Sequence, residues 1–253
     1  MRIGVKIGSS LLTKEGNGIN YPFMIDLCRQ ISQLSKSGDQ VFLVTSGAIK
    51  SDPAVNRSNN LRAAIGMPRL MAKYIEYLGI YGIEAAQMLV VDWDFERNGD
   101  FIKTVIEEAL AQQVVPIFNA NDVVSNDEIE NLAYLADNDH LFLRLCQLLK
   151  PTVAIMGIDQ PGIMHGPGDK EKIGLVGPWN FQSLYNHVTG GHVHTAGQDG
   201  AKIKMIVGRE IAEMGIKFIL APGQEKDFVL RAFDFLIGND GYKSIGTVFV
   251  FNQ

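Results

Sequence analysis

The first residues that could carry out chemistry end a short apolar run near the start of the chain. The segment V-K-I-G-S-S places Lys6 within an expected strand and the small residues Gly8–Ser10 at its carboxyl end, where open α/β sheets bind ligands. An ammonium group is costly in a strand covered on both faces unless it meets an anion, so a phosphate-facing role is favoured over a solvated edge position. Gly8 and the hydroxyl groups would let a phosphate approach backbone N–H groups. The segment is neither a G-x-x-x-x-G-K-[ST] P-loop nor a G-x-G-x-x-G fingerprint.

A second turn of small residues follows the next apolar run. Its sequence is T-S-G-A, residues Thr45–Ala48, and it would lie at the same edge of the sheet as the first. Backbone N–H groups in such a turn suit carboxylate binding. A glycine needed only for chain reversal explains the segment equally well.

Two clusters of amide and carboxylate side chains lie close together farther along the chain. Their members are Asn119, Asn121, Asp122, Asp137, Asn138 and Asp139. The preference for Asp or Asn at a helix N-cap explains one of the last three, but not the rest. Gathered at the carboxyl ends of strands, these groups could hold the ammonium group of an amino acid, while an aspartate orients a nearby lysine.

The segment G-Q-D-G-A-K-I-K-M forms the last cluster, with Gly197 and Gly200 ahead of a helix that carries Lys202 and Lys204. Glycines that lead into a helix N-terminus make an anion site from free N–H groups. Lysines in the first turn oppose the helix dipole unless an anion compensates them. On this segment alone, a phosphate site and an ordinary helix start are equally supported.

A metal site is not predicted. His192 and His194 have the spacing of two ligands on one strand face. No nearby cysteine or paired carboxylate accompanies them, so a surface pair is favoured over a metal centre.

The elements that must position these residues alternate between short apolar runs and longer amphipathic stretches, which predicts an α/β fold with a mostly parallel sheet. Strands are expected at Ile3–Gly8, Gln40–Thr45, Gly82–Val90, Val114–Asn119, Thr152–Met156, Lys217–Leu220 and Gly246–Phe251. Helices are expected at Pro22–Ser37, Leu61–Leu78, Asp100–Gln112, Asp139–Leu149, Gly200–Met214 and Gln224–Phe235. The glycine-rich stretch Asp159–Gly200 breaks the pattern and is expected to be a loop-rich excursion near a site, or a lid.

Length and composition limit the class of protein. A chain of 253 residues with 46% hydrophobic and 20% charged residues fits one globular α/β domain. The net charge of −5 argues against broad binding to nucleic acid or to an anionic membrane. Cys28 and Cys146 match no metal or disulfide pattern, so we expect two buried thiols in a reducing compartment. No apolar stretch has the length of a signal peptide or of a membrane span. We therefore expect a soluble, cytoplasmic protein.

The order of the motifs resembles the glutamate 5-kinases of the amino acid kinase superfamily. The resemblance spans Ile3 to Phe249, and the motifs that carry it are V-K-I-G-S-S, T-S-G-A, A-A-I-G-M-P-R-L-M, A-A-Q-M-L, P-I-F-N-A-N-D, D-N-D-H-L, G-Q-D-G-A-K-I-K-M and I-G-T-V-F. Its most specific part is the N-x-N-D and D-N-D pair with the closing G-T-x-F.

This resemblance implies a three-layer αβα sandwich that forms a single amino acid kinase domain over residues 1–253, without a C-terminal PUA domain. It implies transfer of the γ-phosphoryl group of ATP to the side-chain carboxylate of L-glutamate, the first step of proline biosynthesis. Mg²⁺ would bridge the nucleotide phosphates. A homo-oligomer and feedback inhibition by proline, at or beside the glutamate site, are further implications.

The resemblance also implies residue roles. Lys6 and Lys204 would neutralise charge on the transferred phosphoryl group, and Asp139 would hold these lysines in place. The positions that correspond to glutamate binding are Ser46, Gly47, Asn121, Asp122 and Asn138. The positions that correspond to nucleotide binding are Lys6, Gly8, Ser9, Ile158, Asp159, Gly197, Gln198, Asp199, Gly200, Ala201, Lys202, Ile203 and Lys204.

Several segments depart from the family pattern. The chain has N-A-N-D for N-E-N-D, A-D-N-D for G-D-N-D, and G-Q-D-G-A-K-I-K for G-T-G-G-M-x-T-K, which places Asp199 beside the expected phosphate path. Ile49–Asp52 replaces small residues in the loop that borders the glutamate site in the family. Two alternatives therefore accompany the leading hypothesis: a related kinase that acts on another small carboxylate, and a non-catalytic protein that binds an amino acid or a nucleotide.

Overall fold

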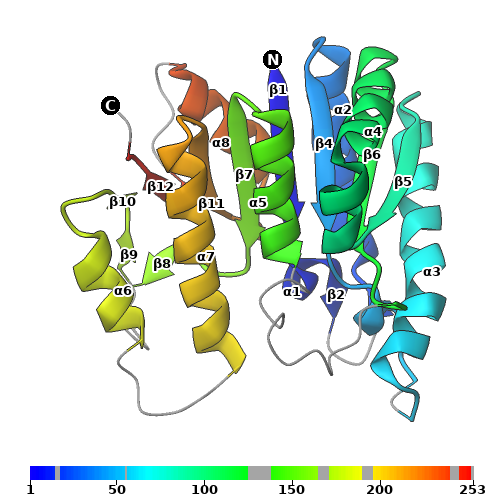
Figure 1. Ribbon diagram of the computed structural model, residues 1–253, viewed down its shortest axis with the longest axis horizontal. Coiled ribbons are helices and arrows are strands. Elements are labelled where there is room, and N and C mark those ends of the chain that lie inside the picture. Colours follow the sequence, from blue (N-terminus) through cyan, green and yellow to red (C-terminus); the bar gives the residue numbers. More distant parts are fainter. Residues whose placement is uncertain are drawn as a thin grey trace.

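A twisted sheet of eight strands runs through the centre of the molecule (Figure 1). The computed structural model describes residues 1–14, 18–54, 56–124, 138–164, 171–189, 196–239 and 245–251, and at residues 189 and 196–199 the backbone only. The strand order is β10-β12-β11-β7-β1-β4-β6-β5. The strands are β1 (Arg2–Ile7), β4 (Gln40–Thr45), β5 (Ala85–Val90), β6 (Val115–Ala120), β7 (Val153–Ile158), β10 (Leu175–Val176), β11 (Lys217–Pro222) and β12 (Thr247–Phe249).

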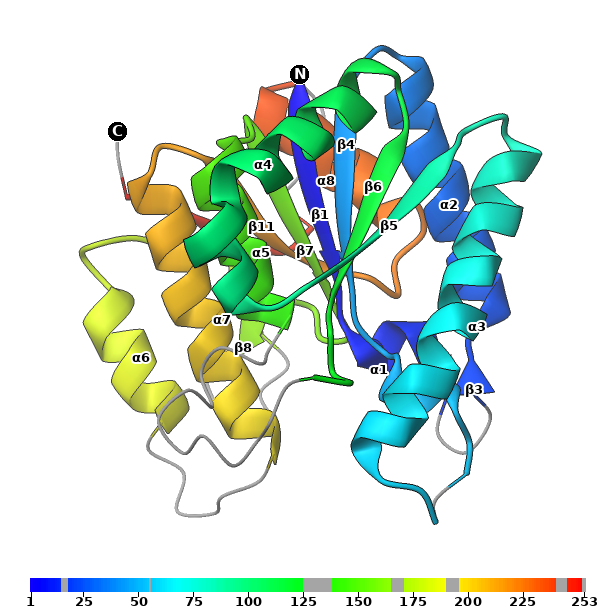
Figure 2. The same cartoon turned by 45° about the vertical axis from the view of Figure 1, so that its right-hand side comes forward.

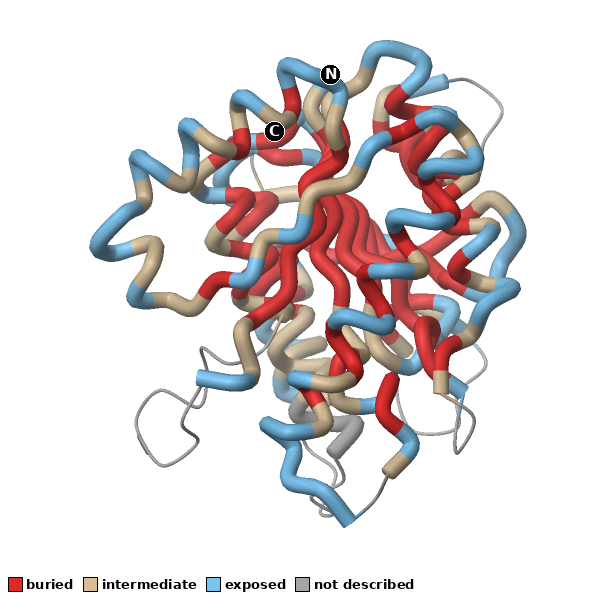
Figure 3. The backbone as a smooth tube through the Cα atoms, turned by 90° about the vertical axis from the view of Figure 1, so that its right-hand side faces the viewer, coloured by how far each residue is buried: buried red, intermediate tan, exposed pale blue. Residues whose placement is uncertain are grey.

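Every pair of neighbouring strands in this sheet is parallel except β11 and β12, which are antiparallel. Parallel strands must be joined by crossovers, so helices cover both faces of the sheet. The central strands are accordingly almost wholly buried, as Figure 3 shows. Burial on both faces explains why these strands are continuous apolar runs in the sequence.

Helices form a layer on each side of the sheet, and Figure 2 shows the two layers from a second direction. One layer consists of α2 (Tyr21–Lys36), α3 (Asn59–Ile80) and α8 (Phe228–Ile237). The other consists of α4 (Asp92–Ala111), α5 (Asn138–Leu149) and α7 (Ala196–Glu213). A separate hydrophobic cluster fills the space between the sheet and each layer. The expected three-layer αβα sandwich is confirmed.

Small elements complete the fold, several of them at the carboxyl ends of the strands. They are α1 (Ser9–Leu12), the hairpin of β2 (Thr13–Lys14) and β3 (Gly18–Ile19), the 3-10 turn η1 (Ile49–Ser51), the pair β8 (Ile163–Met164) and β9 (Lys172–Ile173), and α6 (Phe181–Thr189). The helix α6 packs against α7 at one end of the molecule (Figure 1).

All seven expected strands and all six expected helices are present; β4 has the expected bounds, and those of the other elements are shifted. The largest shift is in α4, which begins at Asp92 rather than Asp100. Asn98 has non-helical backbone angles (φ −130°, ψ 20°) and kinks this helix. The apolar residues before and after the kink therefore do not share one helical period. A single 3.6-residue period fits only the part of α4 after Asn98. In contrast, α8 begins four residues later than expected, after a turn at Asp227 with φ +57°.

The expectation of a loop-rich excursion over Asp159–Gly200 is wrong for much of its described part. This stretch contains β8, β9, β10 and α6, and β10 extends the central sheet by pairing with β12. These strands have two residues each, and so short a strand leaves no periodic signal in the sequence.

Close packing of α3 against the turn before η1 generates a stability prediction. A Cβ atom at Gly66 would lie 1.9 Å from the carbonyl oxygen of Ala48, whereas one at Gly79 in the same helix would meet nothing within 4 Å. Gly66→Ala should therefore lower the free energy of unfolding by about 1–3 kcal/mol. Gly79→Ala should raise it by up to about 1 kcal/mol. Urea unfolding followed by circular dichroism measures both, and similar effects of the two substitutions would contradict this packing.

Candidate active site

The position of Lys6 follows from the alternation of side chains along β1. The odd-numbered residues of this strand belong to the hydrophobic cluster under α2, α3 and α8, so the even-numbered residues face α5. Gly4 leaves room for Phe42 of β4 and for that helix, because a Cβ atom there would lie 2.6 Å from the ring of Phe42 and 3.0 Å from the ring of Phe142. The helix α5 therefore packs closely over β1, and its first turn lies beside Lys6.

One carboxylate forms ion pairs with two lysines at the carboxyl end of β1. Asp139, in the first turn of α5, forms ion pairs with Nζ of Lys6 and, at 2.9 Å, with Nζ of Lys204 on α7. The side chain of Lys6 is only 4% exposed, whereas that of Lys204 is 25% exposed. Lys204 also donates a hydrogen bond of 3.2 Å to the carbonyl oxygen of Gly200, one helical turn earlier. The structure thus brings together the three residues expected to be catalytic.

Asp139 is ionised at neutral pH although it is 1% exposed. Burial alone raises the pKa of its carboxyl group, but the charges and hydrogen bonds of Lys6 and Lys204 outweigh burial and lower that pKa to about 2. A carboxylate with so low a pKa is a poor general base. Its effect is instead to fix two ammonium groups beside each other.

The turn that follows β4 lies against the end of β1. The N–H group of Ser46 donates a hydrogen bond of 3.2 Å to the carbonyl oxygen of Ile7. Gly47 has φ +96°, which L side chains rarely adopt and which explains the glycine at this position. A Cβ atom there would lie 3.9 Å from Cα of Ser9. The two turns expected to bind ligands are therefore side by side.

The residues expected at the acceptor site are tied to the ends of the strands by backbone contacts. Oδ1 of Asn138 accepts a hydrogen bond of 3.1 Å from the N–H of Ala120 at the end of β6. The N–H of Asn121 bonds to the last residue of β5 at 3.0 Å. The carbonyl oxygen of Asp122 accepts a hydrogen bond of 2.6 Å from the side chain of Asn60 at the start of α3. These contacts join α3, β6 and α5 around one edge of the sheet.

Asn119 lies at the same edge of the sheet, although no individual role was expected for it. Its Nδ2 donates a hydrogen bond of 2.6 Å to the carbonyl oxygen of Thr45, which precedes the turn at Ser46. Its Oδ1 is buried and has no hydrogen-bond partner among the described residues. A buried acceptor without a partner is destabilising, so this oxygen is a group that a bound ligand could satisfy. The signal in the sequence was its place as the first residue of N-A-N-D.

Of the residues expected to contact nucleotide, Gly8 and Asp159 lie at the carboxyl ends of β1 and β7. A Cβ atom at Gly8 would meet nothing closer than 3.7 Å, so packing within the chain does not require this glycine. Asp159 is exposed. The side chain of Ile158, in contrast, is buried in the hydrophobic cluster of the α4–α5–α7 layer, and its carbonyl oxygen accepts a hydrogen bond from the N–H of Gly223.

The start of α7 differs from the expectation. This helix begins at Ala196 rather than Gly200, so both Gly197 and Gly200 lie inside it. The expectation that Lys202 and Lys204 lie in the first turn is therefore wrong, because they follow that turn. A glycine costs a helix only about 1 kcal/mol relative to alanine, and the apolar face of α7 packs in the core.

The other expected residues on α7 divide into two groups. Ala201, Lys202 and Ile203 are half-buried, and Ile203 packs against the hydrophobic cluster under α4, α5 and α7. Gln198 and Asp199 have helical backbones, but their side chains lie outside the described residues, as do Asp137 and the two histidines at 192 and 194.

Three observations concern the expectations about the chain as a whole. Cys28 and Cys146 are free and buried, as expected, and burial raises the pKa of Cys28 to about 12. Within the described ranges, no group of three or more His, Cys, Asp or Glu residues could hold a metal ion. In the same part of the chain, every helix is too short or too polar to cross a bilayer.

The buried ion pairs of Asp139 generate a prediction about pH and stability. Asp139→Asn should lower the free energy of unfolding at pH 7 by about 3–5 kcal/mol, because it leaves Lys6 buried without its counter-charge. The pKa of Asp139 in the folded protein, about 2, lies below the ordinary aspartate value of 3.8. The carboxylate therefore stabilises the fold fully above pH 3.8, and this contribution is lost as the pH falls towards 2. The difference between wild type and variant should shrink over this range in urea unfolding.

Asp100→Asn removes an exposed carboxylate from α4 and serves as the control. It should change the free energy of unfolding by less than about 0.5 kcal/mol at every pH. A difference between wild type and Asp139→Asn that stays constant from pH 4 to pH 2 would show that the lysines do not lower the pKa of Asp139.

Comparison with known proteins places this site in a family. Residues 1–221 match the model described as the amino acid kinase family. The chain is 29% identical over 244 residues to the glutamate 5-kinase of Shewanella amazonensis, an alignment that covers 91% of this chain and 63% of that enzyme. It is 30% identical over 243 residues to the glutamate 5-kinase of Nitrosomonas eutropha, covering 91% of this chain and 64% of that enzyme. The chain thus spans a little less than two thirds of the length of these relatives.

A solved structure shows the same fold. The isopentenyl phosphate kinase of T. acidophilum, in its product complex, matches with a TM-score of 0.62 and 15% identity, covering 98% of this chain and 100% of that chain. The expected resemblance is confirmed by the matched residues, by the named relatives and by the αβα architecture. The chain belongs to the amino acid kinase family.

Proposed function

We propose that this protein transfers the γ-phosphoryl group of ATP to the side-chain carboxylate of L-glutamate and so forms γ-glutamyl phosphate, the first step of proline biosynthesis. The observation that carries this proposal is the placement of Lys6, Asp139 and Lys204 at the carboxyl edge of the sheet. The family match and the relatives named glutamate 5-kinase support the choice of reaction.

The chemistry suits a site that has positive charge and no strong base. A carboxylate is already a nucleophile at neutral pH, so phosphoryl transfer needs mainly alignment and charge stabilisation. In the proposed reaction, Lys6 and Lys204 neutralise negative charge on the phosphoryl group, and Asp139 acts as a positioning residue that holds both. The anionic state of Asp139 at neutral pH agrees with this role.

The two substrates would occupy opposite sides of the lysines. The acceptor would lie at the turn of Ser46 and Gly47, with Asn121, Asp122 and Asn138 nearby. The phosphates of ATP would lie towards Gly8, Ser9 and the first turns of α7. Mg²⁺ would be held mainly by phosphate oxygens, since it is often bound through substrate phosphates and few protein groups, and the described residues offer no cluster of three acidic or imidazole ligands.

Three broader features belong to the same proposal. Residues 1–253 would act as one catalytic domain, and the protein would work in the cytoplasm as a homo-oligomer. Proline, the end product of the proposed pathway, would inhibit it at or beside the acceptor turn.

A second candidate is a related kinase for another small carboxylate, and the loop after Gly47 favours it. Asp52 in this loop is buried, and its carboxylate is paired with Arg57 at 2.9 Å and with Arg69 at 3.4 Å. Arg62 donates a hydrogen bond to the carbonyl oxygen of Asp52 at 3.1 Å. Arginines so close to the acceptor turn suit an acceptor with an additional anionic group.

The experiment that separates these candidates measures ADP release with ATP and Mg²⁺, with hydroxylamine present to trap an acyl phosphate. L-glutamate, L-aspartate and N-acetyl-L-glutamate serve as acceptors. Release of ADP that depends on L-glutamate, with trapped γ-glutamyl hydroxamate, supports the proposal. Preference for another acceptor supports the second candidate. Folded protein that binds ATP but turns over none of the three would favour a different acceptor or the remaining alternative, a non-catalytic binding protein.

Substitution of Lys204 tests catalysis more cleanly than substitution of Lys6. Lys6→Ala leaves a buried carboxylate with one counter-charge fewer, so it affects folding as well as catalysis. Lys204 is more exposed, and Lys204→Ala should reduce kcat/KM by at least about 100-fold, the loss typical of a removed charge-stabilising group. Its free energy of unfolding should change by less than about 2 kcal/mol.

Lys103→Ala is the matched control, because Lys103 is an exposed lysine on α4. It should leave kcat/KM and the free energy of unfolding near the wild-type values. Retention of wild-type kcat/KM by Lys204→Ala would remove Lys204 from the proposed mechanism.

A further inference from the structure

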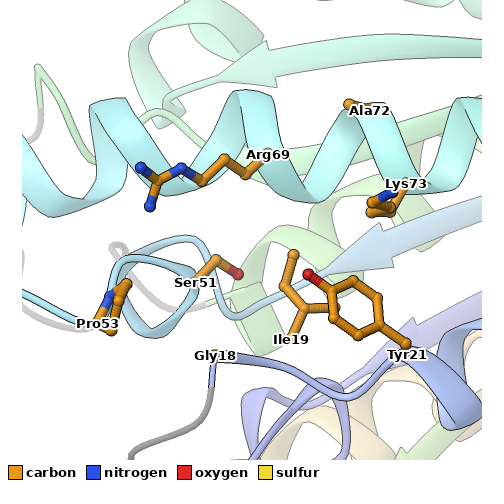
Figure 4. A pocket seen from close by; sticks show the side chains of 8 residues that line it. All are labelled: Gly18, Ile19, Tyr21, Ser51, Pro53, Arg69, Ala72 and Lys73. Atoms are coloured by element: carbon orange, nitrogen blue, oxygen red, sulfur yellow. The ribbon is translucent and has the colours of Figure 1, made fainter.

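A cavity of about 570 Å³ lies outside the proposed catalytic site, between the β2–β3 hairpin, the start of α2, the segment after η1, and α3 (Figure 4). It borders the α2–α3 layer, whereas Asp139 and Lys204 belong to the α4–α5–α7 layer. Binding sites for small molecules in proteins typically measure about 300–1,000 Å³. The cavity is therefore large enough for a small ligand, and the proposed phosphoryl transfer does not use it.

Two cations from one helix line this cavity. Arg69 and Lys73 lie four residues apart on α3, on the same side of the helix, and among the described residues no acidic side chain lines the cavity beside them. Figure 4 shows both on the helix opposite Ile19 and Tyr21. The arrangement favours an anion.

Each cation already has an acidic neighbour, which limits the charge that a ligand could neutralise. Nη1 of Arg69 lies 3.4 Å from Asp52, which Arg57 approaches to 2.9 Å. Nζ of Lys73 pairs with Glu76 at 2.6 Å. A guanidinium group has five N–H donors, so Arg69 keeps donors for a ligand while its charge is partly compensated. Because the charges of Arg69 and Lys73 are partly compensated, the cavity favours a ligand with one negative charge over a phosphate, which carries two.

The other walls are largely apolar. Ile19, Pro53 and the ring of Tyr21 line the cavity opposite the cations. Nζ of Lys73 lies 5.8 Å from the centre of the Tyr21 ring, so the charged and the apolar parts of the cavity adjoin. We propose that this cavity binds a small monocarboxylate with an apolar body, its carboxylate at Arg69 and Lys73 and its body against Tyr21.

The same cavity is connected to the acceptor turn through Ser51, which lines it. The N–H and Oγ of Ser51 donate hydrogen bonds of 2.9 and 2.8 Å to the carbonyl oxygen of Gly47. On the other side, α3 touches this turn, since Gly66 packs against the carbonyl group of Ala48. A ligand that bridges α3 and Ser51 therefore bears on the turn beside Ser46. We infer that the cavity is an effector site, whose ligand alters binding of the acceptor. This part of the proposal rests on the proposed function, in which the turn of Ser46 and Gly47 binds the acceptor.

Binding is tested first, without ATP or acceptor, by saturation-transfer NMR on the full chain. The probe is benzoate, and benzamide is its uncharged counterpart of the same shape. Benzoate should bind more tightly than benzamide, and Arg69→Met and Lys73→Met should each raise its dissociation constant about tenfold, the loss typical of one charge-assisted hydrogen bond. Lys103→Met, on α4, is the control and should leave the dissociation constant unchanged.

The connection to the acceptor turn is tested next. Benzoate should shift the backbone amide resonances of Ser46 and Gly47, and Ser51→Ala should reduce these shifts while benzoate still binds. In the turnover assay, benzoate should change KM for the acceptor more than kcat. Absence of turnover would contradict the proposed function and leave the binding result standing.

Three results would overturn the cavity proposal. They are equal binding of benzoate and benzamide, unchanged benzoate binding in both α3 variants, and no benzoate binding to folded wild-type protein. If benzoate binds but the resonances of Ser46 and Gly47 do not move, the effector role is wrong.

Discussion

The site depends on the need to give a buried lysine a counter-charge. Lys6 lies in β1, a strand covered by helices on both faces, where an ammonium group without an anion would be strongly destabilising. Asp139 supplies that anion, and it can do so only if the first turn of α5 lies directly over β1. Gly4 permits this approach, because a Cβ atom there would collide with the ring of Phe42 and press on the ring of Phe142. The ion pair therefore requires this close packing of α5 on β1, which the apolar face of α5 also stabilises.

Contacts of Asp139 and of its neighbour also link the other elements of the site. Asp139 has a second oxygen, and Lys204 on α7 pairs with it, so α5 and α7 are linked at the carboxyl edge of the sheet. Asn138, the residue before Asp139, bonds to the end of β6. Since β6 is held to β4 through Asn119 and Thr45, the contacts run from the lysines to the turn of Ser46 and Gly47. Each contact joins residues distant in sequence, and all of them meet where parallel strands end.

Much of the fold could be predicted from the sequence because strands covered on both faces are continuous apolar runs. This signal is strong in β1, β4 and β7, and it fails where an element is very short or is kinked. The strand β10 has two residues, and Asn98 interrupts the helical period of α4. Glycines were also misleading at α7, where they lie inside the helix instead of ahead of it, because core packing of the apolar face outweighs their weak helix propensity.

The site was predictable only in part, for a different reason. Residue types at strand ends indicated an anion site at Lys6 and a polar cluster around Asp139, but the pairing between them depends on which strand α5 crosses, and spacing alone does not contain that information. The resemblance to a family supplied it. The cavity beside Tyr21 had no such guide, because its walls come from a hairpin, a turn and two helices, and the A-A-I-G-M-P-R-L-M motif of α3, which contains Arg69, carried no expected role.

The two lysines, although they share one carboxylate, are not equivalent. Lys6 is almost fully buried in a central strand, so its ammonium group cannot move without opening the core, whereas Lys204 is partly exposed on a helix. In the proposed reaction, Lys6 would give a fixed positive potential where charge develops, which requires no reorganisation during the transfer. In the same proposal, Lys204 would be the cation that follows a phosphoryl group from donor to acceptor, because its side chain could exchange the carboxylate for a phosphate oxygen. One immobile and one adjustable cation on a shared anion is an arrangement suited to a group that moves across the site.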